Sequence, residues 1–211
     1  ANLQATTNNG VGTQFCFGTM GVSSGKWYWE CTASVAAQTG VGIDNGGVQW
    51  DNFSNNYYYY TDGTFNNAGT SGAYGASFTN GDIIGVALDM DGGTLAFYKN
   101  GVSQGTAKTG LSGTFVPCNP LGTVSGSMIA NFGQRPFSYT PPTGYVALNT
   151  FNLPTPTIGA TSSSRANKYM DATTYTGAGA PQTVTNSGGL DRKSTRLNSS
   201  HTDISRMPSS A

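Results

Sequence analysis

The stretch from Thr79 to Gln104 constrains the fold more than any other part of this sequence, because it combines tight turns with alternating hydrophobicity. Asp91-Gly92-Gly93 and Asn100-Gly101 supply residues that suit the tight turns of β-hairpins. Every second residue before and between these turns is apolar, the pattern of a strand with one buried face. The stretch therefore predicts a β-meander of three strands. Its predicted interior residues are Ile84, Val86, Leu88, Leu95 and Phe97.

The composition favours strands over helices along the whole chain. Of 211 residues, 30 are glycine and only 9% are charged, whereas about a quarter is charged in typical soluble domains. The shortage falls on residues that form long helices, since Glu30 is the only glutamate. Short strands joined by polar turns predict an all-β fold, an antiparallel sandwich or a barrel.

Six further segments have strand-like patterns. The clearest is Lys26–Ala33, in which Trp27, Trp29 and Cys31 share one face, so we expect the two indoles and this thiol to be buried. Phe132 is also expected inside, whereas residues 1–14 are predicted to be a polar loop. The other predicted strands begin at Phe15-Cys16-Phe17 or span Val41–Asp44, Tyr57–Thr61, Phe115–Cys118 and Ser127–Phe132.

Three motifs match a known family in the same order. The meander reads G-D-x-I-G-V-x-L-D-x-D-x-G-T-L-x-F-Y-K-N-G, residues 25–30 read G-K-W-Y-W-E, and residues 131–134 read N-F-G-Q. These motifs closely resemble the signature of SPRY domains across residues 1–140. The resemblance implies a bent, concanavalin A-like β-sandwich (jelly roll) of two antiparallel sheets. It also implies a domain that binds partners through loops and catalyses no reaction.

Prolines after the matched region predict a domain boundary. Leu153–Thr157 reads L-P-T-P-T, which is typical of an extended linker, so we place the end of a SPRY-like domain at Pro156. Residues 157–190 are expected to form a linker and the truncated start of a second β domain. An L-P-x-P-T segment followed by Y-T-G-x-G resembles phage structural proteins. That resemblance implies a viral context and a location on the virion, in a tail or fibre.

The last 21 residues are expected not to belong to the natural protein. Residues 191–201 and 205–211 can be back-translated into the two ends of a common sequencing-library adapter, separated by a gap of index length. A disordered polar tail is the alternative. The tail holds four of the ten basic and two of the ten acidic residues, so residues 1–190 carry six basic and eight acidic groups, a net charge of −2.

Few residues could support catalysis or metal binding. The only histidine, His201, lies in that tail, so neither a Ser-His-Asp or Cys-His arrangement nor an imidazole metal site is available. Asp89-Met90-Asp91-Gly92 begins like a calcium loop but runs into a strand, which favours a turn. A glycosidase needs two carboxylates, and Glu30 lies in a strand, although an Asp–Asp pair stays open. Three cysteines indicate no disulfide framework. We predict no enzyme, cofactor or metal.

Charge and hydropathy argue against two classes of partner. The formal net charge of +0 gives no basic surface for nucleic acid, and no apolar run approaches the roughly 20 residues of a membrane helix. The leading hypothesis is a non-catalytic module that binds a protein or a surface glycan. A lectin-like carbohydrate-binding module is the second hypothesis, and a glycoside hydrolase is the third. The oligomeric state stays open.

The candidate binding site is the Gly/Asn-rich loop Asn45–Asn56 together with the tyrosine run that follows it. We expect Trp50 and Phe53 to be aromatic anchors and Asp51 and Asn52 to make polar contacts, a mixture typical of recognition loops. Alternation divides the tyrosines between two faces, so at least one pair is expected to face solvent. The alternative is that half of these aromatic residues are in the core. The tyrosines are Tyr57, Tyr58, Tyr59 and Tyr60.

Overall fold

The computed structural model describes residues 3–6, 14–35, 39–45, 55–122 and 126–154, which form thirteen β-strands and no helix. The strands in chain order are β1 (Gln4–Thr6), β2 (Gln14–Phe17), β3 (Lys26–Val35), β4 (Gly40–Asp44), β5 (Asn56–Tyr60), β6 (Thr64–Asn67), β7 (Thr70–Ala73), β8 (Ile83–Asp89), β9 (Thr94–Lys99), β10 (Val102–Thr109), β11 (Val116–Leu121), β12 (Ser127–Asn131) and β13 (Val146–Ala147).

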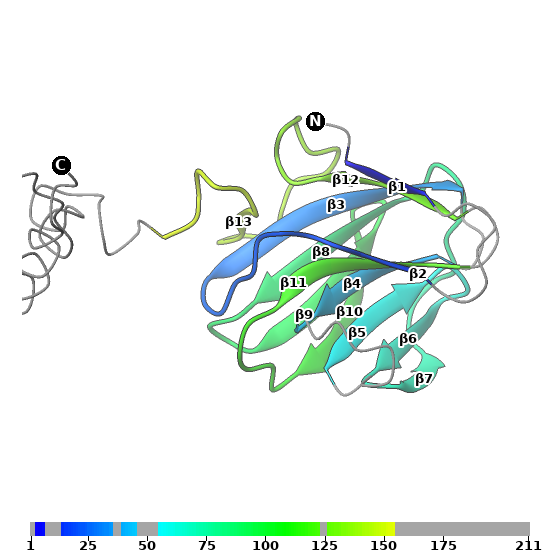
Figure 1. Ribbon diagram of the computed structural model, residues 1–211, viewed down its shortest axis with the longest axis horizontal. Helices are drawn as coiled ribbons and strands as arrows, with labels where there is room; N and C mark the ends of the chain where they lie inside the picture. Colours follow the sequence, from blue (N-terminus) through cyan, green and yellow to red (C-terminus); the bar gives the residue numbers. More distant parts are fainter. Residues whose placement is uncertain (1–2, 7–13, 36–38, 46–54, 123–125, 155–211) are drawn as a thin grey trace, which may run out of the picture. The chain divides into compact units, whose positions relative to one another are not determined.

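These strands form two sheets that stack as a sandwich (Figure 1). Sheet A has the order β1-β12-β3-β8-β9-β10, and β13 pairs in parallel with the first residues of β3. Sheet B has the order β2-β11-β4-β5-β6-β7. All pairs except β13 with β3 are antiparallel, so the predicted all-β antiparallel sandwich is confirmed.

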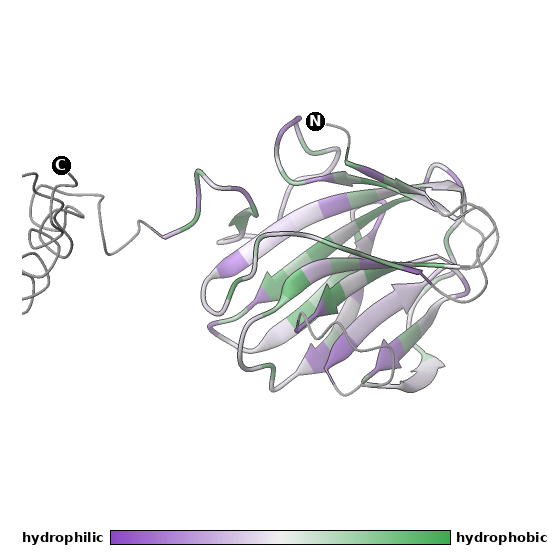
Figure 2. Ribbon diagram, in the orientation of Figure 1, coloured by the Kyte–Doolittle hydropathy of each residue, from purple (hydrophilic) through white to green (hydrophobic). Residues whose placement is uncertain are grey.

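The inward faces of the two sheets meet in one hydrophobic core. Trp27, Trp29 and Cys31 of β3 are buried there, as predicted, and so are the five predicted interior residues of the meander. Figure 2 shows the corresponding run of hydrophobic residues along β8. Phe132, which was also predicted to lie inside, follows the last residue of β12 and is only partly buried against the core.

The hairpin turns of the meander lie where the sequence predicts them. Asn100 and Gly101 have φ angles of 49° and 79°, the left-handed conformation that a tight hairpin requires. At the other turn, the Asp89 carboxylate accepts the N–H groups of Asp91 at 3.0 Å and Gly92 at 2.7 Å. The acidic D-x-D-G segment is therefore a self-bonded hairpin turn, as expected.

Several short strands lie in segments for which the sequence shows no strand pattern. β1 contradicts the prediction that residues 1–14 form only a polar loop. β6 and β7 consist mostly of small and polar residues, and only Phe65 of the two strands enters the core. Their conformation follows from pairing with a neighbouring strand in the sheet, since strand formation depends more on such context than on propensity.

The chain divides into two units, Ala1–Leu153 and Pro154–Ala211. The predicted linker and second domain at 157–190, and the adapter-like tail at 191–211, lie outside the described residues and stay predictions. No helix in the described part of the chain is long and apolar enough to cross a membrane.

Candidate functional site

The part of the outward face of sheet A that β3 forms is covered by the chain itself. Residues 132–149, here called the C-terminal strap, follow β12 and lie against β3. The ring of Phe137 packs edge-on against Tyr28, with 5.0 Å between the ring centroids. The Glu30 carboxylate accepts the backbone N–H groups of Ser138 and Tyr139, both at 2.9 Å. Tyr28 and Glu30 are consequently buried although they point away from the core.

This arrangement gives the only glutamate a structural role. A general acid or nucleophile in a glycosidase must reach a bound sugar, whereas the Glu30 carboxylate is buried and holds two peptide groups of the strap. No group of three or more His, Cys, Asp or Glu that could hold a metal occurs in the part of the chain that the structure describes.

Two aspartates hold the ends of β8. Asp82 accepts the N–H of Thr79 at 2.8 Å and the Asn100 amide at 2.6 Å, and it forms an ion pair with Lys99. These contacts, led by the Thr79 N–H, lower the pKa of Asp82. At the other end, burial alone would raise the pKa of Asp89, but its bonds to Lys26 and to the turn overcome that effect and lower it.

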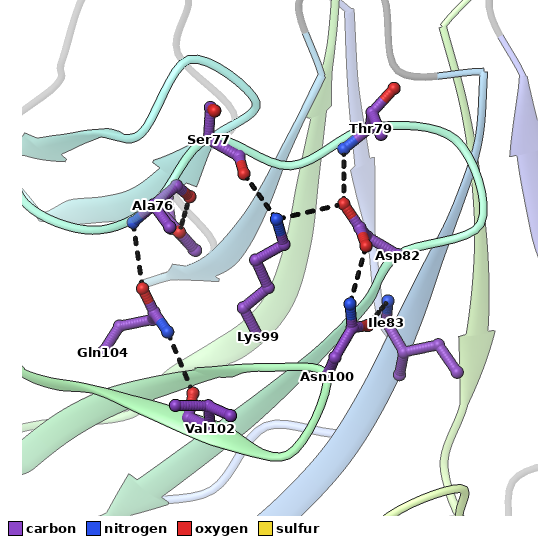
Figure 3. A network of polar contacts seen from close by, with 10 residues as sticks. Ala76, Ser77, Thr79, Asp82, Ile83, Lys99, Asn100, Val102 and Gln104 are labelled. Carbon is purple, nitrogen blue, oxygen red and sulfur yellow. Dashed lines mark hydrogen bonds and ion pairs between the residues drawn. The ribbon is translucent and has the colours of Figure 1, made fainter.

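A polar network around Lys99 fixes the loop between β7 and β8 against the β9–β10 hairpin (Figure 3). Lys99 Nζ donates to the Ser77 carbonyl at 2.7 Å and lies 3.3 Å from Asp82. Gln104 accepts the Ala76 N–H at 2.9 Å, and the Tyr59 hydroxyl donates to the Ala76 carbonyl. Because these groups bond to one another, this end of the sandwich is held in place by its own polar side chains.

The outward face of sheet B carries a row of aromatic rings that we call the aromatic face. It consists of Phe15 and Phe17 on β2 and Tyr58 and Tyr60 on β5. Between β2 and β5 lie β11 and β4, yet the rings of Phe15 and Tyr58 approach to 5.8 Å between centroids. Two further ring contacts, at 6.3 Å each, join Phe15 to Phe17 and Tyr58 to Tyr60.

Glycines on β4 make this approach possible. A side chain on Gly40 would meet Tyr60 and Pro120, because an added Cβ would lie 3.0 Å from the Tyr60 ring and 2.9 Å from Pro120. An added Cβ on Gly42 would lie only 1.9 Å from the Tyr57 carbonyl oxygen. Cross-strand pairing places Gly42 between Cys118 and Tyr58, so only small groups separate the rings of β2 from those of β5.

The four rings of the aromatic face carry no charge, and the chain covers them incompletely. Tyr58 is only 1% exposed, and its hydroxyl donates to the Asp44 carboxylate at 2.6 Å. Burial raises the pKa of Tyr58 above its usual value and raises that of Tyr60 to about 12, so both phenols are neutral at physiological pH. Phe17 is 38% exposed, and Phe15 and Tyr60 are partly exposed. Such a cluster on an outward sheet face differs from the polar surface usual there.

The structure corrects one expectation about the tyrosine run. Tyr57 and Tyr59 enter the core and Tyr58 is buried in the aromatic face, which leaves only Tyr60 partly exposed. The prediction that one pair faces solvent is therefore wrong, because the glycines of β4 let Tyr58 pack beneath its neighbours.

The other predicted site residues, Trp50, Asp51, Asn52 and Phe53, lie outside the described residues. Sequence reasoning also missed Phe15 and Phe17 as surface residues. Their spacing of two places them on one face of a strand, but no sequence pattern shows which other strands share that face.

Comparison with known proteins places the chain in a family. A family profile for the SPRY domain matches residues 12–135. Ran-binding protein 10 from Danio rerio is 36% identical over 106 residues, which covers 47% of this chain and 18% of that protein. Human Ran-binding protein 9 has the same identity over the same length and is covered to 14%. The chain thus spans less than a fifth of the length of these curated relatives.

A solved structure agrees with the profile. The SPRY domain of human HERC1 superimposes with a TM-score of 0.57 at 25% sequence identity, covering 64% of this chain and 91% of that one. The profile covers more than half of the chain, and its matched region includes the meander, the G-K-W-Y-W-E strand and the whole N-F-G-Q motif. This chain belongs to the SPRY domain family.

Proposed function

We propose that this chain is a non-catalytic binding module whose protein partner packs on the aromatic face of sheet B. The observation that carries the proposal is that Phe15, Phe17 and Tyr60 remain partly exposed around the buried Tyr58. Aromatic side chains with fixed neighbours make strong anchors, because little conformational entropy is lost when a partner covers them. Each ring here is held by at least one other ring.

The chemistry of the face favours a protein over a glycan. A sugar needs hydrogen-bonding groups beside the ring on which it stacks, whereas the carboxylate that bonds to a ring of this face, Asp44, is buried and occupied by Tyr58. The relatives named above are called Ran-binding proteins, which supports a protein as the class of partner. A lectin-like function stays the alternative, and it would show itself as glycan binding.

Two finer predictions remain part of this proposal. Anchoring by Trp50 and Phe53 with polar contacts from Asp51 and Asn52 stays a prediction, which Trp50→Ala would test. A place in a phage tail or fibre rests on the resemblance of residues 153–179 alone. The relatives named here come from vertebrates and lend that viral context no support.

The experiment is a selection of binders to the domain from a displayed library of random peptides. Affinities of the enriched peptides are then measured for the wild type and for Phe17→Ser and Tyr60→Ser. We expect both variants to weaken binding about tenfold or more, because central aromatic anchors dominate interface energies. Val102→Ser is the matched control, since Val102 is 66% exposed on the edge of sheet A.

Two results would contradict the proposal. One is a set of enriched peptides whose affinity is unchanged by Phe17→Ser and Tyr60→Ser. The other is binding on a glycan array that Tyr60→Ser abolishes while no peptide is enriched, which would favour the lectin-like alternative.

A further inference from the structure

We propose that the partner adds an extended segment to the free edge of β2, as an extra strand of sheet B that places alternate side chains on the aromatic face. This inference rests on the proposed function and names the geometry and chemistry of the partner. β2 is the terminal strand of sheet B, and no strand in the described part of the chain pairs with its outer side. Strand addition to such an edge is a common mode of peptide recognition.

The hydrogen-bonding pattern between β2 and β11 leaves the peptide groups of Phe15 and Phe17 pointing toward the open edge of the sheet. Gly18 N–H donates to the Pro117 carbonyl at 2.7 Å, and this pair continues the register in which Phe17 faces Cys118. Hydrogen-bonded and non-hydrogen-bonded pairs alternate along an antiparallel ladder. The peptide groups of Phe15 and Phe17 therefore point away from β11, toward the edge. An added strand would bond to the two residues whose rings it would also contact.

The other sheet edges suit this role less well. β10 changes register twice, between Ser103 and Thr106 and again before Lys108, and such bulges and edge lysines discourage pairing. β1 is only three residues long. β7 has an unbroken register but consists of Thr, Ser, Gly and Ala, so an added strand would gain almost no side-chain contact there. β2 combines an unbroken, uncharged ladder with exposed aromatic rings.

Charge restricts the chemistry of the partner segment. The strands that form the aromatic face, β2, β11, β4 and β5, contain one charged residue, Asp44, and Asp62 follows closely after β5. Residues 1–154 carry four Lys or Arg and seven Asp or Glu, so the domain sequence is acidic. We infer a segment with apolar side chains at alternate positions and Lys or Arg at its ends, where a cation could also lie over an exposed ring.

The test uses the same selected peptides with variants that change the edge but keep the rings. Cys16 is exposed between Phe15 and Phe17, so Cys16→Lys introduces an edge charge of the kind that blocks strand pairing. Cys16→Ser is the neutral control. Gly72→Lys places the same charge on β7, where an added Cβ meets nothing within 4 Å.

We expect Cys16→Lys to weaken binding about tenfold or more, and Cys16→Ser and Gly72→Lys to change it less than about twofold. Enriched peptides should alternate apolar with polar residues and carry Lys or Arg. Methylation of alternate peptide nitrogens should abolish binding, because the donors to the β2 edge are lost. Thermal unfolding of each variant checks that the fold is retained.

Four results would overturn the inference. If Phe17→Ser abolishes binding while Cys16→Lys does not, the aromatic face binds partners without strand addition, and the proposed function stands alone. Enriched peptides with acidic ends would contradict the charge argument. A domain that dimerises in sedimentation experiments and is dispersed by Cys16→Lys would show that a second copy occupies the edge. If Phe17→Ser, Tyr60→Ser and Cys16→Lys all leave peptide binding unchanged, the proposed function fails as well.

Discussion

On the outward face of each sheet, tyrosine rings pack against glycines of a neighbouring strand, but the chain covers the rings of only one sheet completely. In sheet A, Tyr28 lies across Gly85, where an added Cβ would lie 2.3 Å from the tyrosine hydroxyl. In sheet B, Tyr58 and Tyr60 lie beside Gly42 and Gly40. Glycine in a strand often marks such a close approach. The C-terminal strap then covers the ring of sheet A, whereas Phe17 and Tyr60 of sheet B stay partly exposed.

The difference in how far the rings are covered implies that the sheet A ring serves mainly folding, whereas the exposed sheet B rings can serve recognition. A ring that the chain covers itself contributes to the free energy of folding, and removing its cover leaves buried groups unsatisfied. A ring that the chain leaves partly exposed contributes less to folding and keeps surface for a partner. Variants on the two faces should therefore differ in how much they destabilise the isolated domain.

The largest loss of stability is expected for Glu30→Ala on the sheet A side. The substitution leaves the N–H groups of Ser138 and Tyr139 without their acceptor beneath the strap. Loss of two such bonds and of a buried side chain should lower the free energy of unfolding by about 4 kcal/mol. Urea unfolding measures the effect. Glu30→Gln keeps one carbonyl oxygen and should lose about half as much. A loss below about 0.5 kcal/mol for Glu30→Ala would show that the strap is not anchored there.

On the sheet B side, Gly42→Ala should be the most costly substitution. Its Cβ would lie 1.9 Å from a backbone oxygen of β5, so the two strands must move apart and the rings above them must shift. We expect a loss of about 3 kcal/mol in urea unfolding. Gly72→Ala on β7 is the matched control, since its Cβ meets no atom within 4 Å. Equal losses for the two variants would contradict the close packing of β4 and β5.

The core and the outward face of sheet A differ in how well the sequence predicts which residues are buried there. The core of the meander could be predicted because alternation and hairpin turns act over a few residues, and Leu88 and Phe97 are buried as expected. Glu30 is different, because its burial depends on Ser138 and Tyr139, more than a hundred residues later. No local pattern reveals such a partner.

The aromatic face could not be predicted for a related reason. Alternation shows that Tyr58 and Tyr60 share one side of a strand, but not that Phe15 lies on the same side of the same sheet. That relation depends on β11, which pairs with β2 on one side and with β4 on the other. The order of the strands in sheet B thus brings the residues of the candidate site together, and the sequence alone identified only its tyrosines.

Acid should weaken the ends of sheet A by a smaller amount. Contacts in the folded state lower the pKa values of Asp82 and Asp89. The stability that these two carboxylates contribute is therefore complete above the unfolded pKa of about 3.8, and it is lost as the pH falls through the folded pKa. Unfolding free energy should stay level from about pH 7 to pH 5 and then fall. Asp82→Asn should make the fall shallower by up to about 1 kcal/mol. Urea unfolding at several pH values gives the comparison, and stability that rises on acidification would contradict it.

The smallest effect on the isolated domain is expected for Phe17→Ser, and this small effect matters most for the function. Phe17 is already 38% exposed and contacts one ring, Phe15, at the edge of the aromatic face. Its replacement should lower the free energy of unfolding by less than about 1 kcal/mol, close to the value for Val102→Ser. An interface anchor, by contrast, often loses about 2 kcal/mol or more of binding energy on truncation. A substitution that lowers the binding free energy more than the free energy of unfolding identifies a residue that acts mainly in binding. If Phe17→Ser instead destabilises the domain as strongly as Glu30→Ala, the aromatic face is a second core, and the contrast between the two sheets disappears.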